Sequence, residues 1–433
     1  PAQRQDDVLV RAADGIANAH PAAVFGRRAL SQPDRLGSHR HEVTLLPRRR
    51  AARQAVGCIW AVLMTGGSVG ARPPRQLRIC AGGDITLGTN LDTAWALRAT
   101  DSAMHPFASL RAPDSLVLPL RPLMRGADVA LVNAEGAIGD GPIAEPKCTP
   151  AQAYCFSLRQ PPAAAHALRT LVDSPAVVVV NLANNHAHDA GLDGFLETLA
   201  LLDSAGVRVT GQDTMPTLVA VTRRDTLAIL GFSAWSDPGV RQLDAVRRLV
   251  ARAAARYRWV VVTAHMGAEG ASAQHTADSV ERYAGEVRGN PVAFAHSAVD
   301  AGALLVVAHG PHVLRAIEWW GRGLIAYSLG NLINYGPFAL GDPRDRGAVL
   351  CATLDRTGGI RAPQLRSTYQ MAPGEIVPDS ARVALRLVAM LSRSDFPETG
   401  ALVNQASGAV RRRRHRPGAA PALRSADVTR SGD

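Results

Sequence analysis

The sequence predicts an α/β protein built from layered sheets. Several apolar runs read as continuous Val, Ile and Leu rather than as alternating apolar and polar residues, which is typical of strands covered on both faces. Helix-like stretches follow many of these runs. Only 5% of the residues are aromatic, which favours many short α/β units over an aromatic-rich β-sandwich. With 433 residues, 47% of them hydrophobic, the chain is long enough to bury a large core.

From Gln76 onward the chain repeats one theme, in which an apolar strand ends in a polar cluster. The sequence shows no internal repeat and no dinucleotide-binding fingerprint. Active residues are therefore expected where strands end, as in other layered α/β proteins. Strands are predicted at Leu77–Ala81, Val129–Val132, Val177–Leu182, Leu227–Phe232, Trp259–Thr263, Leu304–Val307 and Leu324–Tyr327.

Helix-like stretches lie between these strands, and the later part of the chain closes the fold. Two further runs, Gly347–Leu354 and Ala362–Gln370, are interpreted as antiparallel strands that close a sheet. One folded domain is expected over residues 76–395. Helices are predicted at Pro162–Leu171, Gly194–Ala205, Leu243–Tyr257, Pro291–Ala301 and Ala384–Ser392.

The formal net charge of +11 belongs to the two ends of the chain. Residues 1–75 hold 12 arginines against 5 acidic residues, and residues 391–433 hold 8 against 4, so the middle is neutral. A basic groove for nucleic acid is therefore not expected in the folded part. Residues 396–433 read as a basic disordered tail, which could touch acidic polymer or a membrane surface but is more simply a solvated tail.

Residues 48–71 have the layout of a secretory signal. An arginine cluster at Arg48–Arg53 precedes the apolar run Ala55–Ser68, and small residues follow. The run is short for a membrane span, which needs about 20 apolar residues, and the alternative is a buried core helix. A start site assigned too far upstream would explain residues 1–47, which we expect to be an extension without structure of their own. The protein is accordingly predicted to be exported to the periplasm, cell envelope or exterior.

The five cysteines support different interpretations. Cys58 lies inside the predicted signal. Cys80 and Cys351 lie in apolar strand-like runs and are predicted to be buried thiols. Cys148 and Cys155 flank a polar loop, where an exported protein could form a disulfide. A metal pair is the weaker alternative there, because the spacing matches no zinc-knuckle pattern.

Five of the predicted strands end in residues that can bind metal. Each residue alone is weak support, because an Asp after two glycines is usually a turn residue and a lone His is usually an ordinary hydrogen-bonded side chain. Strand ends converge on one edge of a layered sheet, however, so these residues could share one pocket. They are Asp84, Glu135, Asn185, His186, His265, His309 and His312.

Carboxylate oxygens and neutral imidazoles are the ligands of Mn, Fe and Zn. Two carboxylates close together in a partly buried cleft would raise a pKa or destabilise the fold, and a divalent cation resolves that conflict. Glycines beside the ligands, Gly83, Gly267 and Gly310, allow the backbone to approach closely.

These motifs resemble those of a known family. The runs GGDITLG, NAEG, LANNHAHDAGLDG, HMGAE, HGPHVLRAIE and YSLGN occur in order over residues 77–340. They are similar to the motif series of CapA-type proteins, the capsule or poly-gamma-glutamate synthesis proteins of the calcineurin-like metallophosphatase superfamily. The cysteine pair Cys148 and Cys155, in the run KCTPAQAYCF, also resembles the pattern of this family. The resemblance implies a four-layer αββα sandwich with two divalent metal ions, Mn, Fe or Zn, at one edge.

The resemblance also implies a role for each site residue. Asp84 would serve the first metal, and Glu135 and Asn185 would lie between the metals or on one of them. His186 resembles the histidine that protonates the leaving group, so it is the predicted general acid. The imidazoles would divide between the ions, with His265 and His312 on one and His309 on the other. Hydrogen bonds or nearby charges supporting these ligands are expected from Asn133, Asp189, Glu269 and Asn331.

The sequence departs from the phosphatase pattern at two positions. Thr86 stands where a phosphatase has a histidine, and Glu135 stands where Asp is usual. Both departures are shared with the CapA-type series, but they could weaken one metal position.

Three functional hypotheses remain open. The first is a two-metal hydrolase that acts on a phosphoester of an envelope polymer or a lipid-linked carrier, or polarises an amide. The second is a non-catalytic accessory protein that binds an anionic polymer such as polyglutamate during capsule assembly. The third is an α/β protein whose histidines are structural and bind no metal.

Overall fold

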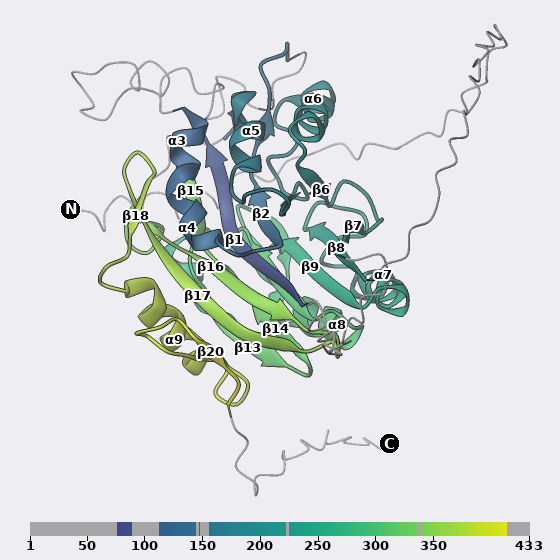
Figure 1. The fold of residues 1–433 in the computed structure, drawn as a ribbon, viewed down its shortest axis with the longest axis vertical. Coiled ribbons are helices and arrows are strands. Elements are labelled where there is room, and N and C mark those ends of the chain that lie inside the picture. Colours follow the sequence, from purple (N-terminus) through teal and green to yellow (C-terminus); the bar gives the residue numbers. More distant parts are fainter. Residues whose placement is uncertain are drawn as a thin grey trace, which may run out of the picture. The chain divides into compact units, whose positions relative to one another are not determined.

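The computed structural model describes residues 76–88, 112–143, 147, 156–221, 225–336 and 340–413. Two large β-sheets form the centre of this part of the chain (Figure 1). Sheet 1 has eight strands and sheet 2 has six. The predictions for residues 1–47 and 48–71, and the pair Cys148 and Cys155, lie outside the described residues. Within the described ranges, every helix is too short or too polar to span a bilayer.

Sheet 1 is organised around its first strand. β1 pairs in parallel with β2 on one side, and on the other side it pairs first with antiparallel β16 and then with parallel β15. The strand order is β18-β17-β16-β1-β2-β5-β6. The strands are β1 Leu77–Leu87, β2 Val129–Ala134, β5 Val177–Asn181, β6 Arg208–Thr210, β15 Asn331–Tyr335, β16 Arg346–Leu354, β17 Ile360–Met371 and β18 Glu375–Pro378.

Sheet 2 has a parallel centre and antiparallel edges. Its order is β13-β14-β12-β9-β8-β7, with β8, β9, β12 and β14 running parallel. The carboxyl ends of the parallel strands therefore share one edge of the sheet. The strands are β7 Thr217–Ala220, β8 Thr226–Ser233, β9 Trp259–His265, β12 Leu305–His309, β13 Ile317–Trp320 and β14 Gly323–Ala326.

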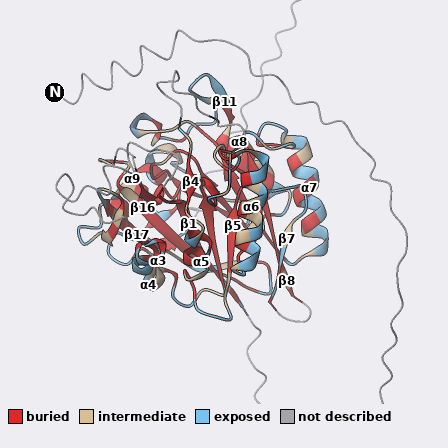
Figure 2. Cartoon of the chain, turned by 90° about the horizontal axis from the view of Figure 1, so that it is seen from above, coloured by how far each residue is buried: buried red, intermediate tan, exposed pale blue. Residues whose placement is uncertain are grey.

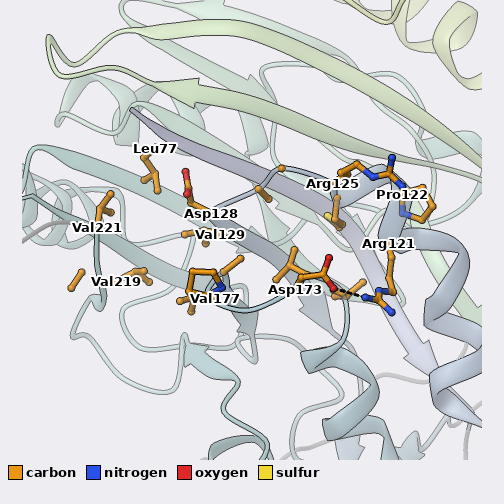
Figure 3. Close-up of a pocket in the computed structure, with 18 of the residues that line it drawn as sticks. Leu77, Arg121, Pro122, Arg125, Asp128, Val129, Asp173, Val177, Val219 and Val221 are labelled. Carbon is orange, nitrogen blue, oxygen red and sulfur yellow. Dashed lines mark hydrogen bonds and ion pairs between the residues drawn. The ribbon is translucent and has the colours of Figure 1, made fainter. Parts of the chain in front are cut away.

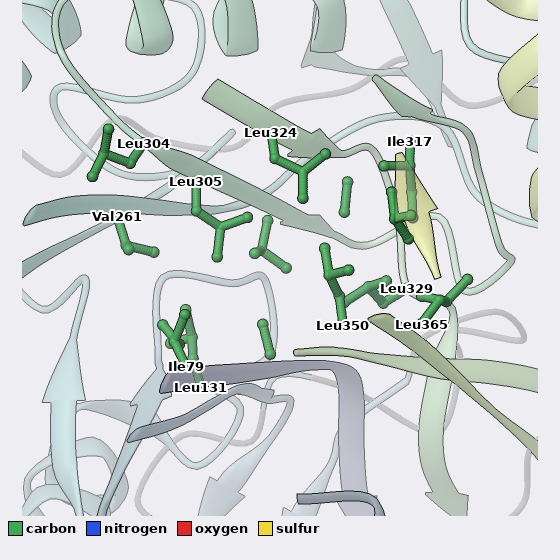
Figure 4. Packing of buried hydrophobic residues seen from close by; sticks show 14 of the residues in the cluster. Ile79, Leu131, Val261, Leu304, Leu305, Ile317, Leu324, Leu329, Leu350 and Leu365 are labelled. Carbon is green, nitrogen blue, oxygen red and sulfur yellow. The ribbon is translucent and has the colours of Figure 1, made fainter. Parts of the chain in front are cut away.

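The inner faces of the two sheets share one hydrophobic core (Figure 4). Ile79 of β1 and Leu131 of β2 face Val261 of β9 and Leu305 of β12 across it. Successive residues of each strand point to opposite faces, so Cys80, between Ile79 and Ala81, packs outward instead. Because both faces are buried, these strands are apolar throughout, which is why they read as continuous runs in the sequence.

Helices cover the outer faces of both sheets, which completes the four predicted αββα layers (Figure 2). α3, α4, α5 and α6 bury their apolar sides on sheet 1, and α7 and α8 do so on sheet 2. α9 packs against β13, β16 and β17. The helices are α3 Pro113–Val117, α4 Arg121–Met124, α5 Ala163–Arg169, α6 Gly191–Ser204, α7 Leu243–Arg256, α8 Pro291–Asp300 and α9 Val383–Asp395, with short 3-10 turns η2 Leu118–Leu120 and η3 Ala271–Ala273.

Three small two-stranded sheets complete the described elements. Their strands are β3 Ala137–Ile138 with β4 Arg159–Gln160, β10 Glu281–Tyr283 with β11 Glu286–Gly289, and β19 Leu402–Val403 with β20 Val410–Arg411. The last pair corrects the expected start of the basic tail at residue 396. Gly400 bridges to Glu318 and Ala409 to Gln364, so ordered packing continues to residue 413. The apolar residues Ala401, Val403 and Val410 join the inner core and hold this segment in place.

Cys80 and Cys351 form a disulfide, which corrects the prediction of two free thiols. Their predicted burial is confirmed, because neither residue is exposed to solvent. They lie directly opposite each other in the ladder between β1 and β16, although 271 residues separate them in the sequence. Neither apolar run reveals that the two strands are neighbours, so the sequence alone gave no sign of this pairing.

Candidate metal centre

The predicted site residues meet where the carboxyl ends of the central strands lie. In sheet 1, Asp84 of β1 lies opposite Asn133 of β2 and Asn331 of β15. In sheet 2, His265 of β9 lies opposite His309 of β12. The strand register therefore aligns these side chains in neighbouring rows at one edge of each sheet.

Asp84 joins the two rows. Its buried carboxylate accepts hydrogen bonds from Asn133 Nδ2 at 2.8 Å and from the backbone N–H of Gly310 at 3.4 Å. Its oxygens lie 3.9 Å from His265 Nδ1 and 3.4 Å from His312 Nδ1. A carboxylate from sheet 1 is thus surrounded by imidazoles from sheet 2 and the loop that follows β12.

Glu135 supplies the second buried carboxylate, directly after β2. Its Oε1 lies 3.5 Å from His312 Nε2, 3.8 Å from His265 Nε2 and 4.0 Å from His186 Nε2. Ligand atoms of Asp84, Glu135 and His312 all lie within 4.8 Å of one another. That spacing allows one cation to be shared among them.

Four buried polar atoms at this edge have no hydrogen-bond partner: Glu135 Oε1, Asn185 Oδ1, His265 Nε2 and His309 Nδ1. Leaving such an atom unpaired costs about 1–3 kcal/mol. The other ring nitrogens are occupied, because His309 Nε2 lies 2.9 Å from Thr263 Oγ1 and His265 Nδ1 lies 3.1 Å from the Asn133 amide. All four atoms are oxygen or imidazole nitrogen, so the donors present fit divalent cations of the Mn, Fe and Zn group.

Burial dominates the electrostatics of the cluster. It raises the pKa of Glu135 to about 8, despite the opposing charge of His312. It lowers the pKa of His309 to about 4 and that of His265 well below its ordinary range. Burial alone would raise the pKa of Asp84, but the hydrogen bond and charge of His312 lower it overall. Burial alone would lower the pKa of His312, but the charges of Glu135 and Asp84 raise it overall.

His186 is held in a fixed orientation beside the cluster. Its Nδ1 lies 2.6 Å from Asp189 Oδ2, which leaves Nε2 on the side of Glu135. The buried Asp189 also accepts hydrogen bonds from the Leu158 backbone N–H and from Lys147 Nζ, both at 2.7 Å. Asp189 therefore fixes the orientation of the His186 ring.

The remaining predicted supporting residues also reach the cluster. Asn331 Oδ1 lies 3.0 Å from His312 Nδ1, and Glu269 Oε2 lies 3.9 Å from His312 Nε2. Thr86, the departure from the phosphatase pattern, donates a hydrogen bond from its hydroxyl to the Glu135 carbonyl oxygen at 2.9 Å. The threonine thus fixes the backbone of a candidate ligand.

Two backbone positions next to the candidate ligands have unusual geometry. A Cβ at Gly83 would lie 1.8 Å from the Gly330 carbonyl oxygen, so only glycine allows β1 to approach that turn. His312 has a φ of 56°, a left-handed conformation that is uncommon for a residue with a side chain. Such conformations concentrate at functional sites, where the surrounding structure holds them.

Several residues of this region were missed by the sequence interpretation. Asn181 and Asn184 donate hydrogen bonds to Asn133 Oδ1 at 3.0 and 3.4 Å and so orient its amide toward Asp84. Both belong to the NLANNH run, and that cluster of asparagines was the available signal. Thr263 had no signal, because it reads as one more β-branched residue of a buried strand.

The segment between β9 and α8 is anchored by a buried arginine that the sequence did not mark. The Arg315 guanidinium donates to both Glu281 oxygens at 2.9 Å and to the Ala273 carbonyl oxygen at 2.6 Å. Glu281 Oε2 in turn accepts from the Ala268 backbone N–H at 2.7 Å. This ion pair ties the β10–β11 hairpin to the loop that follows His265.

A cavity of about 550 Å³ lies at the opposite end of sheet 1, where β1, β2 and β5 begin (Figure 3). Its lining includes Leu77, Val129, Val177 and the ion pair between Arg121 and Asp173. None of the predicted metal ligands lines it. The candidate metal centre and this cavity therefore lie at separate places in the folded part of the chain.

The fold and the site together define a class: a layered αββα protein with a carboxylate and imidazole cluster at the edge of its sheets. Residues 78–336 match the family described as bacterial capsule synthesis protein PGA_cap. The chain belongs to this family.

Two curated relatives carry names consistent with that family. A capsule biosynthesis protein CapA of Bacillus anthracis is 29% identical over 182 residues, which cover 37% of this chain and 41% of the relative. A PGA biosynthesis protein CapA of Bacillus subtilis (strain 168) is 27% identical over 246 residues, covering 52% of this chain and 57% of the relative. The matched regions thus span about half the length of these relatives.

Solved structures are similar only at a distance. The GAP50 anchor in the inner membrane complex of Plasmodium has a TM-score of 0.35 and 11% identity, covering 73% of this chain and 95% of that chain. A 5'-nucleotidase precursor from Thermus thermophilus has the same TM-score and identity, covering 75% of this chain and 60% of that chain.

Proposed function

We propose that this protein is an exported, metal-dependent phosphoesterase that acts on a phosphoester of a capsule or other envelope polymer. The observation that carries the proposal is the set of four buried atoms without a hydrogen-bond partner, on Glu135, Asn185, His265 and His309. Buried polar atoms in folded proteins rarely lack a hydrogen-bond partner, so several such ligand atoms gathered at one edge favour a bound cation as the compensating partner. Bound cations of the Mn, Fe or Zn group would supply Lewis-acid polarisation of the phosphoryl oxygens and charge neutralisation.

The chain's own residues provide the proton transfer. Hydrolysis joins a water oxygen to phosphorus and breaks the ester P–O bond, so the leaving oxygen must gain a proton. His186 fits this role because Asp189 holds Nδ1 and leaves Nε2 directed at the cluster, 4.0 Å from Glu135 Oε1. Asp189 also stabilises the charged imidazole until the proton is given up.

The disulfide supports the exported location. Cys80 and Cys351 are joined in the interior of sheet 1, and disulfides persist in oxidising compartments rather than in the cytosol. The names of the Bacillus relatives place those proteins in capsule or PGA biosynthesis, which supports an envelope polymer as the substrate.

The test compares two neighbouring histidines in the Mn-loaded protein. His186→Asn should lower release of the chromogenic alcohol from phosphomonoesters and diesters by about 100-fold or more, with metal content retained. His188→Asn is the matched control, because His188 is exposed and stacks on Phe195. This control should leave both turnover and metal content unchanged.

Two outcomes would contradict the proposal. If the wild-type protein releases no more alcohol than His186→Asn from any phosphoester, the protein is a binding component of polymer assembly rather than an enzyme. If elemental analysis of metal-replete protein finds no bound transition metal, the cluster is structural.

A further inference from the structure

The end of β8 carries a feature that the proposed hydrolysis does not use. Trp235 follows this strand, and its ring centroid lies 5.9 Å from that of the buried His265. The tryptophan nevertheless keeps 37% of its surface exposed. It therefore extends from the candidate metal centre to solvent.

Trp235 is held in place from several directions. Its backbone N–H donates to Ser233 Oγ at 3.1 Å, in a turn that Ser236 closes with further hydrogen bonds. Its indole N–H donates to Glu286 Oε1 at 3.4 Å. The Arg288 guanidinium carbon lies 4.4 Å from the ring centroid. A large aromatic surface that is fixed before binding loses little entropy when a ligand stacks on it.

The charges around Trp235 select the kind of ligand. Arg288 is buried, and it is already paired with Glu269 at 2.8 Å and Glu286 at 3.1 Å. Both carboxylates already engage the guanidinium, so Arg288 is not available to hold a polyanionic chain at this position. The exposed Glu286 and the neighbouring Tyr283, which is 41% exposed, offer hydrogen bonds instead.

We propose that Trp235 is the stacking surface for a sugar ring of the substrate, so that the site takes glycosyl phosphoesters. A pyranose presents an apolar C–H face that packs on an aromatic ring, and hydroxyl groups at its edge that donate to carboxylates. The phosphoryl group then lies at the Asp84 and Glu135 cluster while the sugar lies on Trp235. This inference rests on the proposed phosphoesterase function for the identity of the reacting group, but the stacking itself does not require turnover.

Stacking is tested first without metal or hydrolysis. Saturation-transfer NMR on the full chain, treated with chelator, measures contact with methyl α-D-glucopyranoside. We expect signals on the ring C–H protons in wild type and in Trp235→Phe, and a loss of about ten-fold in Trp235→Ala. The control is Trp320→Leu, which removes a partly buried tryptophan from the edge strand β13, where it stacks on His296. This control should keep the wild-type signals.

Selectivity is tested second, in the Mn-loaded protein. Phosphate release from α-D-glucose 1-phosphate is compared with release from methyl phosphate, which has no ring to stack. The ratio of the two kcat/KM values should fall about ten-fold in Trp235→Ala and remain close to wild type in Trp235→Phe. A tryptophan that only supports His265 would lower both values equally.

Failure of the stacking role and failure of the phosphoesterase function give different results in these experiments. Equal NMR signals in wild type and Trp235→Ala, or no signal in wild type, overturn the stacking role whatever the enzyme does. Sugar contact that depends on Trp235, without turnover of either phosphate, overturns the phosphoesterase and retains the sugar-binding surface. An unchanged selectivity ratio in Trp235→Ala overturns the assignment of glycosyl phosphoesters.

Discussion

Two neighbouring carboxylates dominate the electrostatics of the candidate centre. Glu135 is buried beside Asp84, and two ionised carboxylates at this spacing repel each other in a region shielded from water. Burial, together with the neighbouring charge of Asp84, raises the pKa of Glu135 to about 8, so a chain without metal relieves the conflict by keeping a proton on this acid. A divalent cation relieves it differently, by replacing that proton with a larger positive charge.

A pH-dependent stability follows for chelator-treated protein. The folded chain keeps a proton on Glu135 up to about pH 8, whereas the unfolded chain loses it near the ordinary 4.5, so the folded state binds more protons between these values. His265 and His309 act oppositely, but only below their ordinary value of 6.5. The free energy of unfolding should therefore decrease between pH 6.5 and pH 8.

Urea unfolding at the two pH values checks this expectation. Glu135→Gln, which cannot titrate, should show a smaller decrease than wild type. Adding Mn²⁺ should stabilise wild type more at pH 8 than at pH 6.5, because metal then competes with fewer protons. Equal stability of the chelator-treated wild type at both pH values would contradict the assignment.

The structure brings the candidate ligands and several predicted supporting residues together, but other residues that contact the cluster were not predicted. Asp84, His265 and His309 could be named from the sequence because each is a metal-binding residue type that follows an apolar run. The strand register places them at one edge of the two sheets. Thr263 and Trp235 were missed because neither is an unusual residue at the end of a strand. Their importance depends on which strand lies next to which, and residue type carries no information on that.

At the scale of elements, long apolar strands were easy to predict and short edge elements were not. β2, β8 and β9 extend the predicted runs by two residues or fewer at either end, and β5 ends one residue before its predicted run does. The hairpin β10–β11 was missed because its strands, Glu281–Tyr283 and Glu286–Gly289, are short, largely polar and only partly buried. Such strands are stabilised by long-range contacts, here by Arg315, rather than by their own hydrophobic pattern.

The ion pair between Arg315 and Glu281 should determine the order of this hairpin. Arg315→Lys retains the charge but cannot reproduce the two parallel hydrogen bonds to Glu281, so amide hydrogen exchange over residues 281–289 should become faster by about ten-fold or more. Breaking a buried pair of this kind costs about 3–5 kcal/mol when one partner is removed outright.

The matched control lies on the same hairpin. Arg282 is exposed, and Arg282→Lys should leave exchange over residues 281–289 unchanged. Exchange that is equally slow in Arg315→Lys and wild type would show that other contacts hold the hairpin.

At the scale of the whole molecule, the α/β class followed from strand and helix patterns, but the four-layer arrangement followed only from the family resemblance. Periodicity does not tell which strands share a sheet. The pairing of β1 with β16, and with it the Cys80–Cys351 disulfide, is a property of the complete topology. The ordered segment that carries β19 and β20 was missed for a similar reason, because its few apolar residues are buried by distant parts of the chain.

The disulfide should contribute strongly to stability because it closes a loop of 271 residues. Replacing both cysteines with alanine should lower the free energy of unfolding by about 2–5 kcal/mol. Thermal unfolding with and without reductant measures the effect, and reductant should lower the Tm of wild type more than that of the double variant. Two reactive thiols at Cys80 and Cys351 in protein unfolded without reductant would contradict the assignment.

The central position of β1 also bears on how the chain folds. Leu77–Leu87 is the first described strand to be synthesised, yet one side of it is completed only by Asn331–Tyr335 and Arg346–Leu354. During translation its edge remains open until these distant strands have left the ribosome, as the bridge spanning 271 residues illustrates. Contacts this distant in sequence make folding slow and leave an apolar strand exposed to aggregation in the meantime. A nascent chain that stops short of β16 should therefore depend on chaperones.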